Sequence, residues 1–166
     1  EQVTALTSIE DLKKIATKLE MKIDPKWVTG KLAEEIFEHV AQDKLIEPTF
    51  VMGYPVDTSP LVRAHREIPG VVEKWDLYID GFELATGYSE LVDPVIQRER
   101  LIEQAQLGAK GDLEAMQVDE DFLRAMEFGM PPMGGMGMGV DRLLMALTGL
   151  GIRETILFPL VKPEAD

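Results

Sequence analysis

The sequence contains no cysteine, which excludes disulfide bonds and cysteine-ligated metal sites. It has only two histidines, His39 and His65, and their separation along the chain argues against an ordinary zinc site. Basic residues are also few, because 17 lysines and arginines stand against 30 aspartates and glutamates, for a net charge of −13. An acidic surface repels phosphate backbones at long range, so we expect the main contacts with any nucleic acid to lie outside this chain.

Long hydrophobic runs are absent as well. A helix that spans a membrane needs about 20 apolar residues, and no segment provides them. No signal peptide opens the chain, and its first residue is Glu1 rather than methionine. We therefore expect a cytoplasmic segment without membrane contact that is processed or cut from a longer protein. Its 166 residues, 45% hydrophobic and 28% charged, are typical of a soluble globular domain.

The first 47 residues predict a helical hairpin. Apolar residues recur at helical spacing over 9–19, and Ser8 is the expected N-cap of that helix. A second helix is expected over 30–42. Nothing in this part indicates catalysis, so we take 1–47 and 48–166 as the two units of the chain.

The rest of the chain predicts an antiparallel sheet with separate helices. Segments rich in β-forming residues lie at 49–52, 75–79 and 82–91. The pair Asp80-Gly81 between the last two is a strong signal for a two-residue hairpin turn. The remaining segments are expected to form helices over 94–109 and 119–128, a loop over 129–139, a helix with a buried apolar face from Val140 to Leu147 that ends at Gly149, and a short apolar segment over 155–160. This order predicts an α+β fold, an antiparallel sheet with flanking helices.

The hairpin brings two carboxylates to one face of the sheet. With Asp80-Gly81 as the turn, Tyr78 lies opposite Glu83, and Asp76 shares the face of Tyr78 because side chains alternate along a strand. Diagonal neighbours on paired strands are about 7–8 Å apart. Asp76 and Glu83 could therefore converge on a hard cation such as Mg²⁺, which takes oxygen ligands. The alternative is that both carboxylates face solvent on an edge hairpin.

Farther along the second strand, Thr86, Tyr88 and Glu90 share a face by the same alternation. Glu83 has the opposite parity, so all four residues line one site only if the strand bulges or kinks between residues 84 and 87. Glu90 beside the aromatic ring of Tyr88 could hold an ammonium group by ion pairing and cation–π attraction. An exposed acid beside a packing aromatic residue is the alternative interpretation.

Alternating glycines over 134–139 precede Arg142 and let the backbone approach a flat or phosphate-bearing ligand closely. Arg142 stands in the first turn of the expected helix, where a cation costs about 0.3–1 kcal/mol against the helix dipole. Because arginine is unfavourable at this position of a helix, its presence indicates a function for the guanidinium, which could contact an anion or the plane of a base. The segment is neither a Walker A loop nor a Rossmann fingerprint. A flexible helix entry remains the alternative.

Together, the sequence segments P-T-F, Y-P, S-P-L, E-L-A-T-G-Y-S-E-L, G-M-G-M-G-V-D-R and F-P are far more specific than each one alone. They stand at 48–50, 54–55, 59–61, 83–91, 135–142 and 158–159. In this order they closely resemble the C-terminal part of the catalytic domain of class II lysyl-tRNA synthetases. Residues 137–142 resemble the third signature motif of that class, and 1–47 resemble the helical insertion that precedes this region.

The resemblance implies a lysine–tRNA ligase, which makes lysyl-adenylate from lysine and ATP and then passes the lysyl group to tRNA. It implies that Asp76 and Glu83 hold Mg²⁺ against the ATP phosphates, and that Glu83 and Arg142 serve catalysis. The implied lysine-binding residues are Thr86, Tyr88 and Glu90. The implied ATP-binding residues are Glu83, Gly137, Gly139 and Arg142.

The first two class II motifs and the anticodon-binding barrel have no counterpart in the sequence. This implies a fragment of a homodimeric parent whose main tRNA contacts lie elsewhere, and a chain that is inactive alone. Asp76 stands where glutamate is usual and Thr86 where asparagine is usual, which leaves the subtype open. The alternatives are a lysyl-tRNA synthetase-like paralogue, either fused to a lysyl-phosphatidylglycerol synthase or lysylating a protein, and a non-enzymatic binding module with this fold. A related aspartyl or asparaginyl synthetase is disfavoured by the acid at Glu90.

Overall fold

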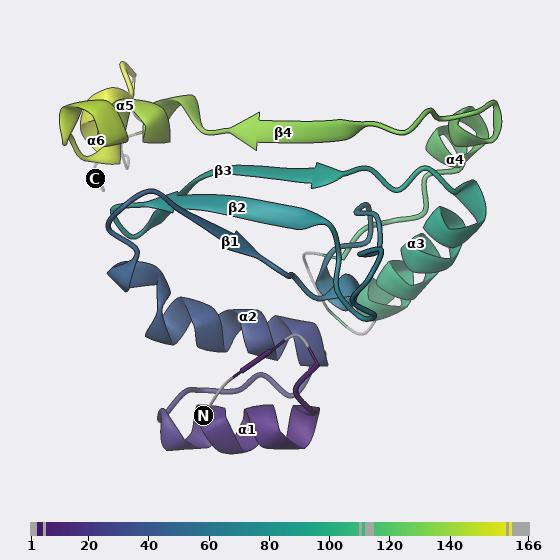
Figure 1. The fold of residues 1–166 in the computed structure, drawn as a ribbon, viewed down its shortest axis with the longest axis horizontal. Helices are drawn as coiled ribbons and strands as arrows, with labels where there is room; N and C mark the ends of the chain where they lie inside the picture. Colours follow the sequence, from purple (N-terminus) through teal and green to yellow (C-terminus); the bar gives the residue numbers. More distant parts are fainter. Residues whose placement is uncertain (1–2, 5, 110, 112–114, 159, 161–166) are drawn as a thin grey trace, which may run out of the picture.

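The computed structural model describes residues 3–4, 6–109, 111, 115–158 and 160. Its elements, in chain order, are α1 (Ile9–Lys18), α2 (Thr29–Val40), η1 (Gln42–Lys44), β1 (Thr49–Met52), η2 (Val56–Thr58), β2 (Lys74–Ile79), β3 (Phe82–Ser89), α3 (Pro94–Ala109), α4 (Glu120–Glu127), β4 (Gly134–Met138), α5 (Val140–Thr148) and α6 (Ile152–Thr155). The four strands form one antiparallel sheet in the order β1-β2-β3-β4. Helices α1 and α2 lie on one side of the sheet, with α3 and α4 at one end and α5 and α6 at the other (Figure 1). The predicted α+β class is confirmed.

The two N-terminal helices pack on each other as predicted. Ser8 caps α1, and its hydroxyl accepts a hydrogen bond from the backbone N–H of Asp11. The shared core consists of Leu12, Ala16, Leu32, Ala33 and Ile36. Helix α2 also contacts the sheet, because the ring of Phe37 meets that of Tyr78 edge to face at 5.7 Å. A domain boundary at residue 47 therefore stays a prediction.

The hairpin between β2 and β3 has the predicted register. Asp80 and Gly81 both adopt positive φ, as a two-residue turn of this kind requires, and Tyr78 pairs with Glu83. The register then shifts, so that Leu77 pairs with Ala85 and Leu84 is the extra residue of a β-bulge. The bulge reverses the parity of β3 beyond Glu83. The sequence required such an irregularity between residues 84 and 87. The structure places it at Leu84, while Gly87 pairs regularly with Trp75.

The segment 129–139, predicted as a loop, instead contains a strand. β4 pairs with β3 from Gly134 opposite Ser89 to Met138 opposite Ala85. Glycine has no side chain to pack and therefore weakens a strand. The composition of this segment, taken alone, thus favours a loop. The backbone of β3 supplies the pairing partner that overrides this preference.

The sheet has one polar face and one apolar face. Strand pairing and alternation place Lys74, Asp76, Tyr78, Glu83, Thr86 and Tyr88 on the polar face. A buried cluster of Tyr54, Val62 and Val72 packs against Tyr88 and Val51 on this side. The apolar face carries Phe50, Met52, Trp75, Met136 and Met138, and among them Phe50 and Met52 are 60% and 72% exposed.

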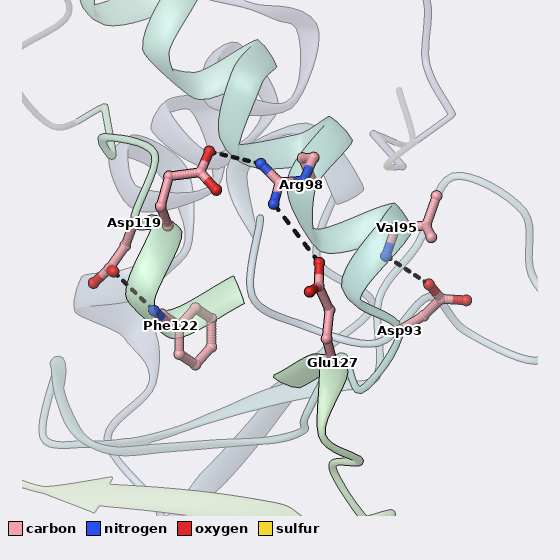
Figure 2. Close-up of polar contacts among 7 residues, drawn as sticks. Asp93, Val95, Arg98, Asp119, Phe122 and Glu127 are labelled. Atoms are coloured by element: carbon pink, nitrogen blue, oxygen red, sulfur yellow. Dashed lines mark hydrogen bonds and ion pairs between the residues drawn. The ribbon is translucent and has the colours of Figure 1, made fainter. Parts of the chain in front are cut away.

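Polar contacts fix the helices at the far end of the sheet. Asp93 accepts a hydrogen bond from the backbone N–H of Val95 and Asp119 accepts one from that of Phe122, so each aspartate caps a helix start. Figure 2 shows Arg98 of α3 between two carboxylates of α4. Its guanidinium lies 2.6 Å from Glu120 and 3.8 Å from Glu127. These contacts hold α3 and α4 together around the buried side chains Leu101, Leu123 and Met126.

The prediction of a buried face on the helix after Val140 is wrong for this structure. Helix α5 ends at Gly149 in the left-handed conformation, as predicted, but none of its residues is buried, and Val140 and Leu147 are 70% and 74% exposed. Within the described part of the chain, α5 packs mainly on α6 and β3, and no element covers its apolar face. Pro159 of the expected C-terminal segment lies outside the described residues. No helix among the described residues has the length and hydrophobicity of a membrane span.

Candidate functional site

The predicted site residues come together along the polar face of the sheet. The pairing of Asp76 with Thr86 and of Tyr78 with Glu83 brings both carboxylates to the same face. Thr86 and Tyr88 lie opposite Gly137 and Gly135 of β4. Arg142 reaches the same region from the start of α5. The roles inferred for these side chains from the sequence stay predictions, but the fold gathers them on one surface.

Asp76 is the most buried charged residue of this surface, with 3% of its surface exposed. Its Oδ2 lies 3.0 Å from the ammonium of Lys74. Its Oδ1 and the hydroxyl of Tyr54 are both buried and make no hydrogen bond within the described structure. Burial, reinforced by the neighbouring Asp76 carboxylate, raises the pKa of Tyr54, so the phenol stays protonated. Asp76 therefore keeps one buried carboxylate oxygen without a well-formed hydrogen bond, beside a Tyr54 hydroxyl whose pKa responds to the Asp76 carboxylate.

Glu83 and Arg142 meet where the β-bulge and the helix start adjoin. The Arg142 guanidinium donates a 2.7 Å hydrogen bond to the backbone carbonyl of Glu83, and the N–H of Gly139 donates to the carbonyl of Leu84. A Cβ on Gly139 would lie 3.3 Å from the Arg142 side chain, so glycine leaves room for that contact. The Glu83 carboxylate makes no ion pair with another described residue. An anchored guanidinium beside a carboxylate without a partner suits an anionic ligand that carries a divalent cation.

Glu90 lies at the other end of the polar face, just after β3. Burial raises the pKa of its carboxyl group, and the Glu90 charge in turn adds to the effect of burial in raising the pKa of Tyr88. Tyr88 pairs with Gly135 of β4, and a Cβ on Gly135 would lie 2.7 Å from Oε1 of Glu90, so the Glu90 carboxylate lies next to the residue that pairs with Tyr88. No cation of the described chain pairs with Glu90, so this half-buried acid beside an aromatic ring is suited to an ammonium ligand.

The glycines of β4 form the floor between these groups. Gly135 and Gly137 face the polar side of the sheet, while the methionines between them face the apolar side. A Cβ on Gly135 would lie 2.7 Å from Oε1 of Glu90, which is a clash. Gly135 belongs to the glycine-rich segment 134–139 but is not among the predicted site residues. Glycine at every second position of 135–139 was a usable signal, because it is typical of a strand whose one face lacks side chains.

Two further residues of the site, Lys74 and Tyr54, were missed by sequence reasoning. Lys74 is two residues before Asp76 and shares its face, so the alternation along β2 was a usable signal. Tyr54 reaches the site from a loop, and no local pattern indicates that approach. The ammonium of Lys74 lies 3.9 Å from the centre of the Tyr54 ring. Together the two residues form the wall behind Asp76.

The site has the donors for a cation that is shared with a ligand, not for one held by protein alone. In the described part of the chain, no cluster of three or more histidine, aspartate or glutamate residues could hold a metal ion. Two carboxylates, one with an orphaned buried oxygen, fit Mg²⁺, which usually keeps several waters and takes phosphate oxygens as further ligands. The arrangement therefore has the chemistry for an ammonium at one end and a metal-bound phosphate at the other, and both uses stay predictions.

The chain is similar in sequence to several known proteins. The chain is 68% identical over 165 residues to the lysine–tRNA ligase of Kineococcus radiotolerans. The aligned region covers 99% of this chain and 33% of that protein. It is 56% identical over 172 residues to the lysine–tRNA ligase of Mycobacterium tuberculosis, covering the whole chain and 34% of that protein. It is also 54% identical over 164 residues to the lysylphosphatidylglycerol biosynthesis bifunctional protein LysX of Mycobacterium avium, of which it covers 14%. The chain thus spans about a third of the length of the curated ligases it matches.

The family model described as tRNA synthetases class II (D, K and N) matches residues 2–162, nearly the whole chain. This match confirms the family that the sequence segments indicated. The chain belongs to the class II tRNA synthetases of the D, K and N group.

Proposed function

We propose that this chain forms the lysine- and ATP-binding part of a lysine–tRNA ligase, which activates lysine with ATP and transfers the lysyl group to tRNA. The observation that carries the proposal is the half-buried Glu90 carboxylate, which lies over Gly135 opposite Tyr88, on the same polar face as Asp76, Glu83 and Arg142. The acid suits the side-chain ammonium of lysine, whereas an aspartate substrate would need a cation there. The high identity to proteins named lysine–tRNA ligase supports the same substrate.

In the proposed first step, a carboxylate oxygen of lysine attacks the α-phosphorus of ATP, an oxygen–phosphorus bond forms, and pyrophosphate leaves. No protein nucleophile is needed, so positioning and charge stabilisation supply the catalysis. Glu90 and Tyr88 would fix the lysine ammonium, and the glycine floor would admit the ligands. Arg142 would stabilise the negative charge on the phosphate. Mg²⁺, held by Asp76 and Glu83, would neutralise phosphate charge when bound.

The proposal is tested with a chimeric ligase, in which these 166 residues replace the matching third of the Kineococcus radiotolerans ligase. We expect lysine-dependent exchange between ATP and pyrophosphate, followed by charging of tRNA, at rates near those of the natural ligase. The isolated chain, assayed beside it, is expected to show no exchange. Catalytic groups that act as a unit lose most of their effect when some of them are missing, and this chain carries only some of the groups of the ligase. A folded chimeric ligase that activates another amino acid, or none, would contradict the proposal.

The remaining partners follow from this proposal. tRNA would make its main contacts with parts of the ligase outside these residues, since this chain is strongly acidic. The ligase would act as a homodimer in the cytoplasm, where tRNA is charged. The match to LysX is consistent with the same lysine-activating surface in a longer protein.

Replacing Glu83 by glutamine in the chimeric ligase should lower the rate of adenylate formation by roughly a hundredfold or more, because the site loses a carboxylate that the metal-bound phosphates need. The melting temperature should change little, because the Glu83 contact that Arg142 uses is the backbone carbonyl. Single-turnover adenylation and thermal unfolding measure the two effects. Wild-type adenylation in Glu83→Gln would remove this residue from the site.

Replacing Gly135 by alanine should weaken lysine binding about tenfold or more, because the new methyl group would lie 2.7 Å from Oε1 of Glu90 and displace that carboxylate. Gly108→Ala is the matched control, since Gly108 lies on α3 outside the proposed site and its Cβ would make ordinary contacts, at 3.5 Å with Ala115 and 3.7 Å with Gln117. Titration calorimetry of lysine on both chimeric variants makes the comparison. Equal lysine affinity in the two variants would show that Gly135 does not shape the pocket.

A further inference from the structure

Lys74 occupies a position that no part of the proposed reaction explains. Its ammonium lies 3.0 Å from Oδ2 of Asp76 and 3.9 Å from the centre of the Tyr54 ring. Its side chain is 22% exposed and that of Asp76 only 4%. The pair is therefore largely withdrawn from water, and salt screens a buried ion pair much less than an exposed one. The ring of Tyr54 supports the cation from a second direction.

This ion pair makes the two carboxylates of the polar face unequal. Asp76 already has a cation on Oδ2, and only the buried Oδ1 lacks a partner. Glu83 has no ion pair within the described chain. A divalent cation that approaches the protein alone meets one available carboxylate and one whose charge Lys74 largely cancels. Such a set is weak, because Mg²⁺ gives up its waters reluctantly.

A purely structural role for Lys74 does not account for the orphaned oxygen. An ion pair that serves packing alone is expected to satisfy both oxygens of a buried carboxylate, since an unpaired buried polar atom is unfavourable. Here Oδ1 is buried, and the Tyr54 hydroxyl interacts with the Asp76 carboxylate strongly enough to add to the effect of burial in raising its own pKa, yet neither atom makes a well-formed hydrogen bond. Oδ1 of Asp76 thus remains available as an acceptor, while the ammonium of Lys74 neutralises the charge at Oδ2.

We propose that Lys74 is a built-in counter-cation for Asp76, which keeps the affinity for a free divalent cation low and makes metal retention depend on the phosphates of the nucleotide. This inference deepens the proposed function, since the nucleotide is the ATP of that reaction. Lys74 is a positioning residue: it holds the Asp76 carboxylate in place and touches neither substrate. The metal then enters together with the polyphosphate, whose oxygens supply the ligands that the protein lacks.

The test compares unsubstituted protein with Lys74→Gln, which can still donate a hydrogen bond to Asp76 but carries no charge, and with Lys74→Met. In the 166-residue chain, Mg²⁺ should raise the melting temperature of both variants and leave that of the unsubstituted chain nearly unchanged. In the chimeric ligase without nucleotide, Mn²⁺ binding followed by electron paramagnetic resonance should strengthen about tenfold or more in Lys74→Gln. With a non-hydrolysable ATP analogue present, the difference should shrink.

Two control variants locate the effect. Asp76→Asn combined with Lys74→Gln should abolish the Mg²⁺ effect, because the carboxylate that needs the cation is gone. Glu34→Gln combined with Lys74→Gln should retain it. Glu34, on α2, is another carboxylate that interacts with Lys74. Burial raises the pKa of Glu34, whereas the hydrogen bond that the Thr58 hydroxyl donates to it and the charge of Lys74 both lower that pKa.

The inference is overturned if Lys74→Gln binds Mn²⁺ no more tightly than the unsubstituted protein, or if Lys74→Arg behaves like Lys74→Gln. It is also overturned if neither uncharged variant folds in millimolar Mg²⁺, since the ion then cannot replace the ammonium. These readouts need no catalytic turnover. A chimeric ligase that lacks lysine-dependent exchange would contradict the proposed function while leaving the metal measurements interpretable.

Discussion

Replacing Glu90 by glutamine in the chimeric ligase is expected to weaken lysine binding by about 2–5 kcal/mol without destabilising the protein. The loss has two sources, because the ion pair disappears and the ammonium of lysine is left in a half-buried site without a counter-charge. Glutamine has nearly the same shape as glutamate, so packing against Tyr88 is preserved. The expected result is a near-complete loss of lysine-dependent pyrophosphate exchange at ordinary lysine concentrations.

The pH dependence gives a second signature of the same residue. Burial raises the pKa of Glu90 above its ordinary value of 4.5. Lysine binding needs the ionised carboxylate. As the pH is lowered, the affinity for lysine should therefore begin to fall at a higher pH than it would if Glu90 were fully exposed. Glu90→Gln should not show this fall. Folding responds in the opposite sense: the folded state holds the proton more tightly, so the unfavourable burial of the charge is present at neutral pH and is relieved as the pH falls through the raised pKa. Glu90→Gln should therefore be as stable as the unsubstituted protein at neutral pH, or slightly more stable.

Titration calorimetry with lysine across the acidic range, together with thermal unfolding at each pH, tests both statements. Glu99→Gln is the matched control, because Glu99 is exposed on α3 and is not one of the proposed site residues. It should leave affinity and its pH dependence unchanged. An unaltered lysine affinity in Glu90→Gln would reject the selectivity role of Glu90.

Local signals in the sequence predicted the part of the site that depends on one hairpin. The turn Asp80-Gly81 fixes the register, and the register fixes which face Asp76 and Glu83 share. The same reasoning required a bulge or kink between residues 84 and 87, and the structure has a bulge at Leu84. These features follow from alternation along two neighbouring strands, which short stretches of sequence specify.

Features that depend on distant partners were not predictable in this way. The glycine-rich strand β4 exists because β3 offers it a ladder of backbone groups, and its composition gave no sign of that. Tyr54 comes to Asp76 from a separate loop, so the supporting wall behind the carboxylate went unseen. The apolar face of α5 was predicted to be buried from its periodicity alone. Periodicity indicates which face is apolar but not whether a partner within the same chain covers it.

Replacing Arg142 by alanine in the chimeric ligase should lower kcat/KM for ATP by roughly a hundredfold or more, because the guanidinium stabilises charge that develops on the phosphate. The free energy of unfolding should change by no more than about 1 kcal/mol. The substitution removes one exposed hydrogen bond to the Glu83 carbonyl, but it also removes a cation from the first turn of α5, where the helix dipole disfavours it. These two effects oppose each other in stability, whereas nothing compensates for the loss at the phosphate.

The measurement of Arg142 pairs pyrophosphate exchange at varied ATP with thermal unfolding, and it includes two further variants. Arg142→Lys keeps the charge but not the two-pronged donor geometry, so it should recover stability and only part of the ATP use. Arg153→Ala removes an exposed arginine from α6 and should change neither quantity. A large drop in stability with normal ATP use would instead make Arg142 a structural residue, whose purpose is to tie the start of α5 to the β-bulge through the Glu83 carbonyl. The hydrogen bond alone is compatible with both roles, so the ratio of the two effects in Arg142→Ala decides between them.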